Sequence, residues 1–164
     1  MLLALVIAQI YLGALVAGLR AGLIYNTWPL IDGSIVPSAA NLFFDQPLWR
    51  NFFENALTVQ FDHRITAYAL VALALFHAID ARRHDGGGFV ATGASFLAVA
   101  VLAQVMLGVL TVLQSAPIGL AMVHQAMALV VLTAATLHAC RALAPRQTDA
   151  VVHRWNEADA RDVA

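Results

Sequence analysis

The chain has 164 residues, of which 61% are apolar and only 12% charged, and its mean hydropathy is +0.76. Soluble domains are nearer to half apolar and a quarter charged, so this balance argues against an ordinary soluble domain and predicts a membrane protein. The net charge of −1 argues against a nucleic-acid partner, which requires a basic face. Because Cys140 is the only cysteine, the chain can form neither an internal disulfide nor a cysteine metal cluster.

Four apolar stretches are long enough to cross a bilayer as helices, which takes roughly 20 residues each. They cover residues 2–19, 56–79, 89–113 and 118–140. The first stretch is not preceded by a basic segment, so we expect a retained span and not a cleaved signal. The predicted fold is an all-α membrane protein, a four-transmembrane-helix bundle over residues 1–141 surrounded by membrane lipid.

The arginines predict how these spans are oriented. Two arginines lie between the second and third spans and four follow the last span, whereas the loop 20–55 has two arginines against three acidic residues. The positive-inside rule therefore places both termini and the polar tail 142–164 in the cytoplasm, with the loop 20–55 outside. The chain is rich in alanine and contains no lysine, which favours a multi-pass protein of a bacterial inner membrane.

The spans contain an internal repeat. The sequence QIYLGAL at residues 9–15 in the first span resembles QVMLGVL at residues 104–110 in the third. Gly13 and Gly108 occupy matching positions, where we expect them to permit close approach of helices. The repeat predicts two duplicated helical hairpins related by a pseudo-two-fold axis.

Histidines mark the second and fourth spans in the same way. His77 follows His63 by fourteen residues, and His138 follows His124 by the same interval. Fourteen helical residues return a side chain to within about 40° of its starting face, roughly 21 Å further along, so each pair lies on one stripe. His63 and His124 fall at similar depth in parallel helices, where two imidazoles can ligate one metal from opposite sides.

The metal predicted for His63 and His124 is the iron of a haem, a flat apolar macrocycle that accepts axial histidines. A zinc site needs about four ligands, and Asp62 points some 100° away from His63. His77 and His138 form either a second haem pair or interfacial residues left by the duplication. Three alternatives stay open from the residues: a bundle with one haem b, a small di-haem b-type cytochrome that carries electrons, and a non-catalytic bundle with hydrogen-bonded histidines.

Three segments also resemble a known family. LGALVAGLRAGLIYNTWPLIDG, WRNFFENALTVQFDHRITAY and MVHQAMA are similar to the carboxy-terminal half of haem A synthases, in the subtype shared by α-proteobacteria and mitochondria. The resemblance covers roughly residues 5–140. It implies an eight-span oxidoreductase of two four-helix bundles, which oxidises the C8 methyl group of haem O to the formyl group of haem A for terminal oxidases.

In that family the carboxy-terminal bundle binds haem b through one histidine of its second helix and one of its fourth, which match His63 and His124. With four spans, this chain corresponds to the haem b-binding half, and it is either a fragment, a split half that pairs with an amino-terminal four-helix half or with another copy of itself, or a compact relative with a different role. Haem O is the implied substrate, and no catalytic residue is assigned. Arg64, Arg20 and Asn26 are candidates for binding the haem propionates, because an arginine fork matches a carboxylate; the two arginines are alternatively loop or helix-end residues.

Overall fold

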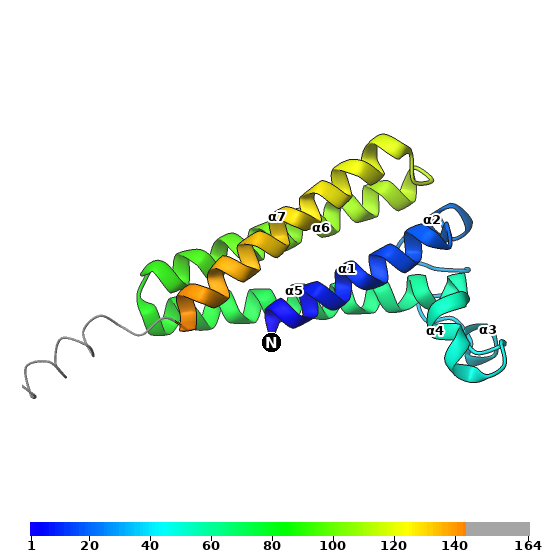
Figure 1. Cartoon of the computed structure of the whole chain (residues 1–164), viewed down its shortest axis with the longest axis horizontal. Coiled ribbons are helices and arrows are strands. Elements are labelled where there is room, and N and C mark those ends of the chain that lie inside the picture. Colours follow the sequence, from blue (N-terminus) through cyan, green and yellow to red (C-terminus); the bar gives the residue numbers. More distant parts are fainter. Residues whose placement is uncertain (144–164) are drawn as a thin grey trace, which may run out of the picture.

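The computed structural model describes residues 1–143, in which all the named elements are helices (Figure 1). The four long helices are α1 (Leu2–Gly18), α5 (Ala56–Asp85), α6 (Phe89–Leu113) and α7 (Ile118–Leu143). Four short helices lie between α1 and α5, namely α2 (Ala21–Ile24), α3 (Ala39–Leu42), η1 (Leu48–Arg50) and α4 (Asn51–Glu54). The predicted cytoplasmic tail, residues 142–164, lies outside the described residues except at its first two positions.

Within residues 1–143, three helices are long and apolar enough to cross a membrane: α5, α6 and α7. Helix α1 is also apolar but has 17 residues. At 1.5 Å per residue it is about 26 Å long, somewhat less than the roughly 30 Å of a bilayer core. The prediction of an all-α membrane protein is therefore confirmed, whereas the fourth span stays a prediction.

Helix α5 continues past its predicted end at residue 79 and reaches Asp85. Its last turn contains Arg82, Arg83 and His84. Basic side chains stabilise the carboxyl end of a helix by interacting with its dipole, and they can stand in water beyond the apolar span. The helix ends at Gly86, whose φ of 56° suits the left-handed conformation of a helix terminus.

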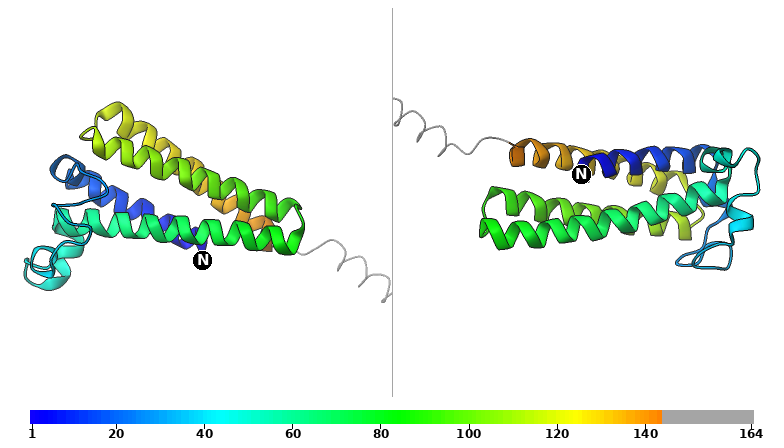
Figure 2. Two further views of the ribbon diagram at one scale, coloured as in Figure 1. Left: turned by 180° about the vertical axis from the view of Figure 1, so that it is seen from behind. Right: turned by 90° about the horizontal axis from the view of Figure 1, so that it is seen from below.

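The long helices form a ring in which α5 and α7 lie diagonally opposite each other. Helix α1 packs against α5 and α7, and α6 packs against the same two helices. The right-hand view of Figure 2 shows α1 and α7 in one layer and α5 and α6 in the other. The α1–α5 pair and the α6–α7 pair meet near the α5–α6 turn and diverge towards the opposite end (Figure 1). The diagonal helices are the two that carry the predicted ligands.

The main apolar core lies in the half of the bundle nearest the α5–α6 turn. Alanines supply most of its buried members: Ala74, Ala78, Ala81, Ala91, Ala94, Ala98, Ala100 and Ala135. Small side chains let helix backbones approach closely. Within the described part of the chain, residues 56–69 and 102–128 contribute no buried member of this core. The half of the bundle that carries His63 and His124 is therefore held by other contacts.

The segment between α1 and α5 forms an ordered cap over the start of α5. Ile31, Leu42 and Leu57 make a second buried apolar cluster there. Asn55 begins α5, since its side-chain oxygen accepts a hydrogen bond from the Leu57 N–H at 3.0 Å, while its amide donates to the carbonyl oxygens of Asn41 and Leu42. One side chain thus fixes both the first turn of α5 and the loop that covers it.

Candidate functional site

His63 lies on α5 and faces α1. The amide Nε2 of Gln9 is 3.1 Å from His63 Nδ1 and 3.3 Å from His63 Nε2, and it donates to the His63 carbonyl oxygen at 3.0 Å. One turn further along α1, a Cβ atom added to Gly13 would lie 3.2 Å from His63 Cε1. Only glycine leaves the imidazole its full space at this position, so α1 both holds the backbone of His63 and makes room for its ring.

His124 on α7 has a related environment, in which α6 supplies a glutamine contact to the backbone carbonyl but none to the ring. Gln104 Nε2 donates to the His124 carbonyl oxygen at 3.0 Å. A Cβ atom added to Gly108 would lie 3.0 Å from His124 Cε1 and 3.5 Å from His124 Nε2. The side chain that approaches each of the two repeated glycines is therefore an imidazole. The sequence repeat indicated close approach at Gly13 and Gly108 but not which atoms approach.

Several polar atoms near these two histidines are buried and lack a hydrogen-bond partner within residues 1–143. They are Oε1 of Gln9, Gln60 and Gln104 and Nδ1 of His124. An unpaired buried polar group costs roughly 1–3 kcal/mol, and the oxygens of Gln9 and Gln104 are left unpaired at equivalent positions of the repeat. The donor set fits a group held by imidazole nitrogens. A cluster of three or more His, Cys, Asp or Glu side chains, as a bare metal ion would need, is not found in the described part of the chain.

The second histidine pair has a different geometry. The Nε2 atoms of His77 and His138 lie 2.7 Å apart, their ring centroids are 5.0 Å apart, and the rings are inclined at 70°. A Cβ atom on Gly93 of α6 would lie 2.9 Å from His138 Nδ1, so a third glycine accommodates this ring. The two imidazoles hydrogen-bond to each other across the diagonal of the bundle, which favours the interhelical interpretation over a second haem.

Arg64, one of the three propionate candidates, holds the loop between α1 and α5. Its side chain is 9% exposed and donates to three backbone carbonyl oxygens, those of Leu30 at 3.2 Å, Tyr25 at 3.2 Å and Thr27 at 2.8 Å. No carboxylate pairs with it among the described residues. The side chain of Arg64, which directly follows His63 in the sequence, therefore places a buried positive charge beside this histidine.

The other two candidates lie at the surface of the loop. The amide of Asn26 donates to the hydroxyl of Ser115 at 3.0 Å and so joins this loop to the α6–α7 turn. Arg20 is exposed at the start of α2. Nearby, the indole of Trp28 donates to the hydroxyl of Tyr68 at 3.0 Å. The Asn26–Ser115 bond links the two hairpins, the Trp28–Tyr68 bond ties the loop to α5, and the structure gives neither Arg20 nor Asn26 a hydrogen bond to His63 or His124.

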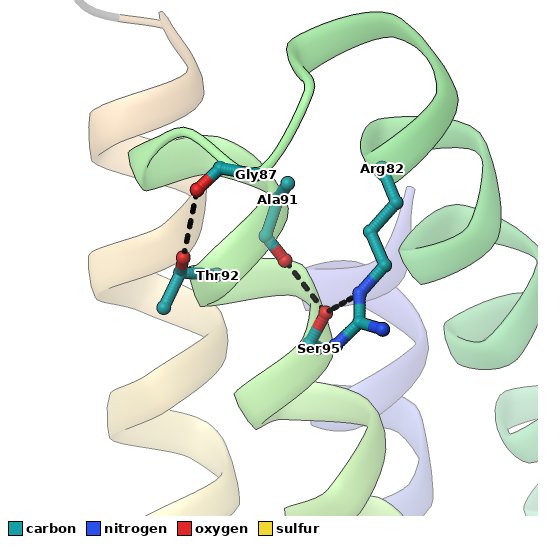
Figure 3. A pocket seen from close by; sticks show the side chains of 5 residues that line it. All are labelled: Arg82, Gly87, Ala91, Thr92 and Ser95. Atoms are coloured by element: carbon teal, nitrogen blue, oxygen red, sulfur yellow. Dashed lines mark hydrogen bonds between the residues drawn. The ribbon is translucent and has the colours of Figure 1, made fainter.

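A pocket of about 360 Å³ lies at the opposite end of the bundle, beside the α5–α6 turn. Figure 3 shows the residues that line it. The Nε–H of Arg82 donates to the hydroxyl of Ser95 at 2.9 Å, and that hydroxyl donates to the carbonyl oxygen of Ala91 at 2.7 Å. Thr92 donates to the Gly87 carbonyl oxygen at 3.4 Å. The pocket lies beside the α5–α6 turn, at the opposite end of the bundle from His63 and His124, and neither histidine lines it.

Comparison with known proteins identifies the family. Residues 1–136 match the family model of the cytochrome oxidase assembly proteins. A “Heme A synthase” of Rhodopseudomonas palustris (strain HaA2) is 61% identical over 145 residues, which are 88% of this chain and 40% of the relative. A “Heme A synthase” of Bradyrhizobium diazoefficiens is 57% identical over 148 residues, 90% of this chain and 41% of the relative.

The chain thus spans about two fifths of the length of the curated relatives it matches. No solved structure matches it significantly. The family model covers the four long helices nearly to the end of α7 and includes both His63 and His124. The chain belongs to the family of cytochrome oxidase assembly proteins.

Proposed function

We propose that this chain is the haem b-binding, carboxy-terminal half of a haem A synthase, an oxidoreductase that converts the C8 methyl group of haem O into the formyl group of haem A. Relatives named “Heme A synthase” that match 88% and 90% of the chain support the activity. The observation that carries the assignment of this half is the matched environment of His63 and His124. Each histidine meets a glutamine and a glycine of the helix that precedes it.

The proposed architecture has four spans, with α1 as the fourth and a pseudo-two-fold axis that relates α1–α5 to α6–α7. The two Gln-to-His contacts of 3.0 Å support this symmetry, because they join equivalent atoms in the two hairpins. A helix slightly shorter than the bilayer is accommodated by local thinning of the lipid. The distribution of arginines supports both termini in the cytoplasm and an inner-membrane location.

His63 and His124 would hold the haem iron, and Arg64 would offer its charge to a propionate. The residues fit this task, because His124 Nδ1 is buried without a partner and Arg64 has no carboxylate partner among residues 1–143. A haem with two axial histidines supplies one-electron oxidation and reduction. If both His63 and His124 hold the iron, they would leave it no open position for O₂ or substrate. The oxidation of haem O would then belong to a partner with its own site, an amino-terminal four-helix half.

Spectroscopy of the purified chain tests the haem assignment. We expect one haem b per chain by the pyridine haemochrome assay. His63→Ala and His124→Ala should each lose it, because the other histidine on each helix face lies roughly 21 Å away along the helix. The matched control is His84→Ala, since the side chain of His84 is 79% exposed at the far end of α5. A purified wild-type chain without haem, or haem retained in both ligand variants, would rule the assignment out.

The synthase activity needs its own test. The chain should be produced in membranes with and without the amino-terminal bundle of a relative, and the extracted haems separated by chromatography. We expect haem A only when both halves are present. If no combination of halves yields haem A, the assignment to this enzyme fails even if haem b is bound.

A variant of the second histidine pair separates this proposal from a di-haem cytochrome. His77→Leu is expected to leave one haem b per chain, because His77 and His138 are hydrogen-bonded to each other at 2.7 Å. A metal bonded to both rings from opposite sides would hold the two nitrogens about 4 Å apart, at roughly 2 Å per bond. The measurement is the haem-to-protein ratio of wild type and variant. A wild-type ratio of two that falls to one in His77→Leu would instead identify the di-haem carrier.

A further inference from the structure

Within each hairpin, a glutamine on the first long helix contacts the proposed iron ligand on the second. Gln9 on α1 donates to the carbonyl oxygen of His63 on α5, and Gln104 on α6 donates to that of His124 on α7, both at 3.0 Å. A helical carbonyl already accepts a bond from the residue four positions on, so the glutamine is not needed to satisfy it. The same surplus contact, made twice at equivalent positions, calls for an explanation beyond helix packing.

The amide oxygens of both glutamines are buried and have no partner in the described part of the chain. A glutamine that uses only its amide N–H groups leaves its acceptor unpaired, which destabilises a buried polar atom. On the other side of the contact, Nδ1 of His124 is also buried without a partner. Each hairpin thus brings a spare acceptor and a ring nitrogen into one small region. An imidazole N–H is the donor that this acceptor lacks.

The tautomer of a ligand histidine supplies that donor. A neutral imidazole that binds a metal through Nε2 carries its proton on Nδ1 and must donate it, and metal-bound histidines nearly always do so to an oxygen. In α5 the amide of Gln9 already lies 3.1 Å from His63 Nδ1. Since Nε2 and Oε1 belong to one carboxamide, a turn of the His63 ring can bring its Nδ1–H onto Oε1 while Nε2 keeps its bond to the His63 carbonyl oxygen.

We infer that Gln9 and Gln104 are positioning residues for the axial histidines: Oε1 of each glutamine accepts the Nδ1–H of its histidine and so fixes the tautomer and orientation of the ring. This inference rests on the proposed haem function. The glycine four residues after each glutamine contributes to the same positioning, because it leaves space for the imidazole ring to lie against the helix. Both elements come from one helix face, since residues four apart are neighbours on a helix.

The inferred hydrogen bond affects the reduction potential of the haem, which packing of the glutamine alone would not do. A hydrogen bond from Nδ1–H to an oxygen increases the basicity of the ligand, and a more basic ligand stabilises the oxidised metal. Without the acceptor, the reduced haem is favoured. Gln9→Leu and Gln104→Leu are therefore expected to raise the reduction midpoint potential. Gln9→Glu and Gln104→Glu keep an acceptor of the same reach and should lower it or leave it at the wild-type value.

The experiment is a redox titration of the purified holoprotein, followed at the Soret band. We expect each leucine variant to keep one haem per chain and to change the ratio of oxidised to reduced haem at fixed potential by about tenfold, which is about 59 mV for one electron. The control is Gln125→Leu, because Gln125 is the exposed neighbour of His124 on α7 and should not move the potential. Low-temperature EPR of the oxidised protein checks the axial ligand field independently.

Each outcome decides the inference. If a leucine variant loses haem while the glutamate variant at the same position retains it, the acceptor is required and the positioning role stands. An unchanged midpoint in both leucine variants with haem retained would overturn the inference. So would loss of haem in leucine and glutamate variants alike, because the packing of glutamine itself would then be what matters. A wild-type chain that binds no haem is a separate result, which rejects the proposed function before any variant is measured.

Discussion

Replacing Arg64 with methionine is expected to lower the free energy of unfolding by roughly 3 kcal/mol, because three backbone carbonyls lose a charged donor. Those carbonyls belong to Tyr25, Thr27 and Leu30. Each hydrogen bond from a charged group contributes roughly 1.5–3 kcal/mol, and water recovers part of the loss at this end of the bundle. The loop should also detach from α5. Denaturation in mild detergent and limited proteolysis of residues 19–55 measure the two effects.

Arg50 provides the matched control for Arg64→Met, because it lies in the same region between α1 and α5. The exposed guanidinium of Arg50 donates to Glu54 and lowers the pKa of that carboxyl below its usual value. Exposed ion pairs contribute little to stability, so Arg50→Met should leave both the unfolding curve and the cleavage pattern nearly unchanged. Equal effects of the two substitutions would show that the carbonyl contacts of Arg64 are not what stabilises the loop.

Gly13 and Gly108, here called the bracket glycines, face the imidazoles of His63 and His124. Gly13→Val or Gly108→Val is expected to weaken haem binding by one to two orders of magnitude. At Gly108 the new Cβ would lie 3.0 Å from His124 Cε1, a distance that forces the ring to turn. Overpacking of this kind costs typically 1–3 kcal/mol, and each 1.4 kcal/mol is a factor of ten in affinity. The ring can move in response, so we expect the bundle to fold and the haem-to-protein ratio to fall in a titration with added haem.

Two other glycines make the controls for this experiment. A Cβ atom at Gly18 on α1 or at Gly119 on α7 would meet nothing within 4 Å. Gly18→Val and Gly119→Val therefore carry the same change in helix propensity without the steric conflict. Haem affinities that fall equally in bracket and control variants would contradict the steric explanation.

Hydropathy alone locates the long helices well, because burial in lipid requires long apolar stretches whatever the tertiary contacts. Helix α6 has the predicted bounds of residues 89–113, and α7 begins as predicted and ends three residues later, at Leu143. Helix α5 is longer than its predicted span of residues 56–79, because hydropathy reports the edge of the apolar region and the charged helical turn continues beyond it. Helix α1 has the apolar composition of a membrane span, but it is shorter than the helices that usually cross a bilayer.

The site itself was only partly accessible from the sequence. Spacing and repeat bring out His63, His124 and the two matching glycines, because they depend on helical periodicity alone. The partners of these residues depend on how each helix is rotated and tilted against its neighbour. For that reason the sequence gives no means to tell that His77 and His138 hydrogen-bond to each other while the other pair does not. The three hydrogen bonds from Arg64 to backbone carbonyl oxygens depend on the path of an irregular loop. The loop sequence has no periodicity from which that path could be predicted.

If the two hairpins rotate relative to each other, the alanine-rich core at one end of the bundle is the fixed point of that rotation. Alanine side chains have no rotamers to adjust, so this end is a stiff pivot at about the level of His77 and His138. His63 lies fourteen residues, or about 21 Å, further along α5. At that radius a rotation of about 3° displaces the ring of His63 by about 1 Å relative to α7. Adding one methylene group between the alanines should therefore change the spacing of the distant imidazoles without touching either of them.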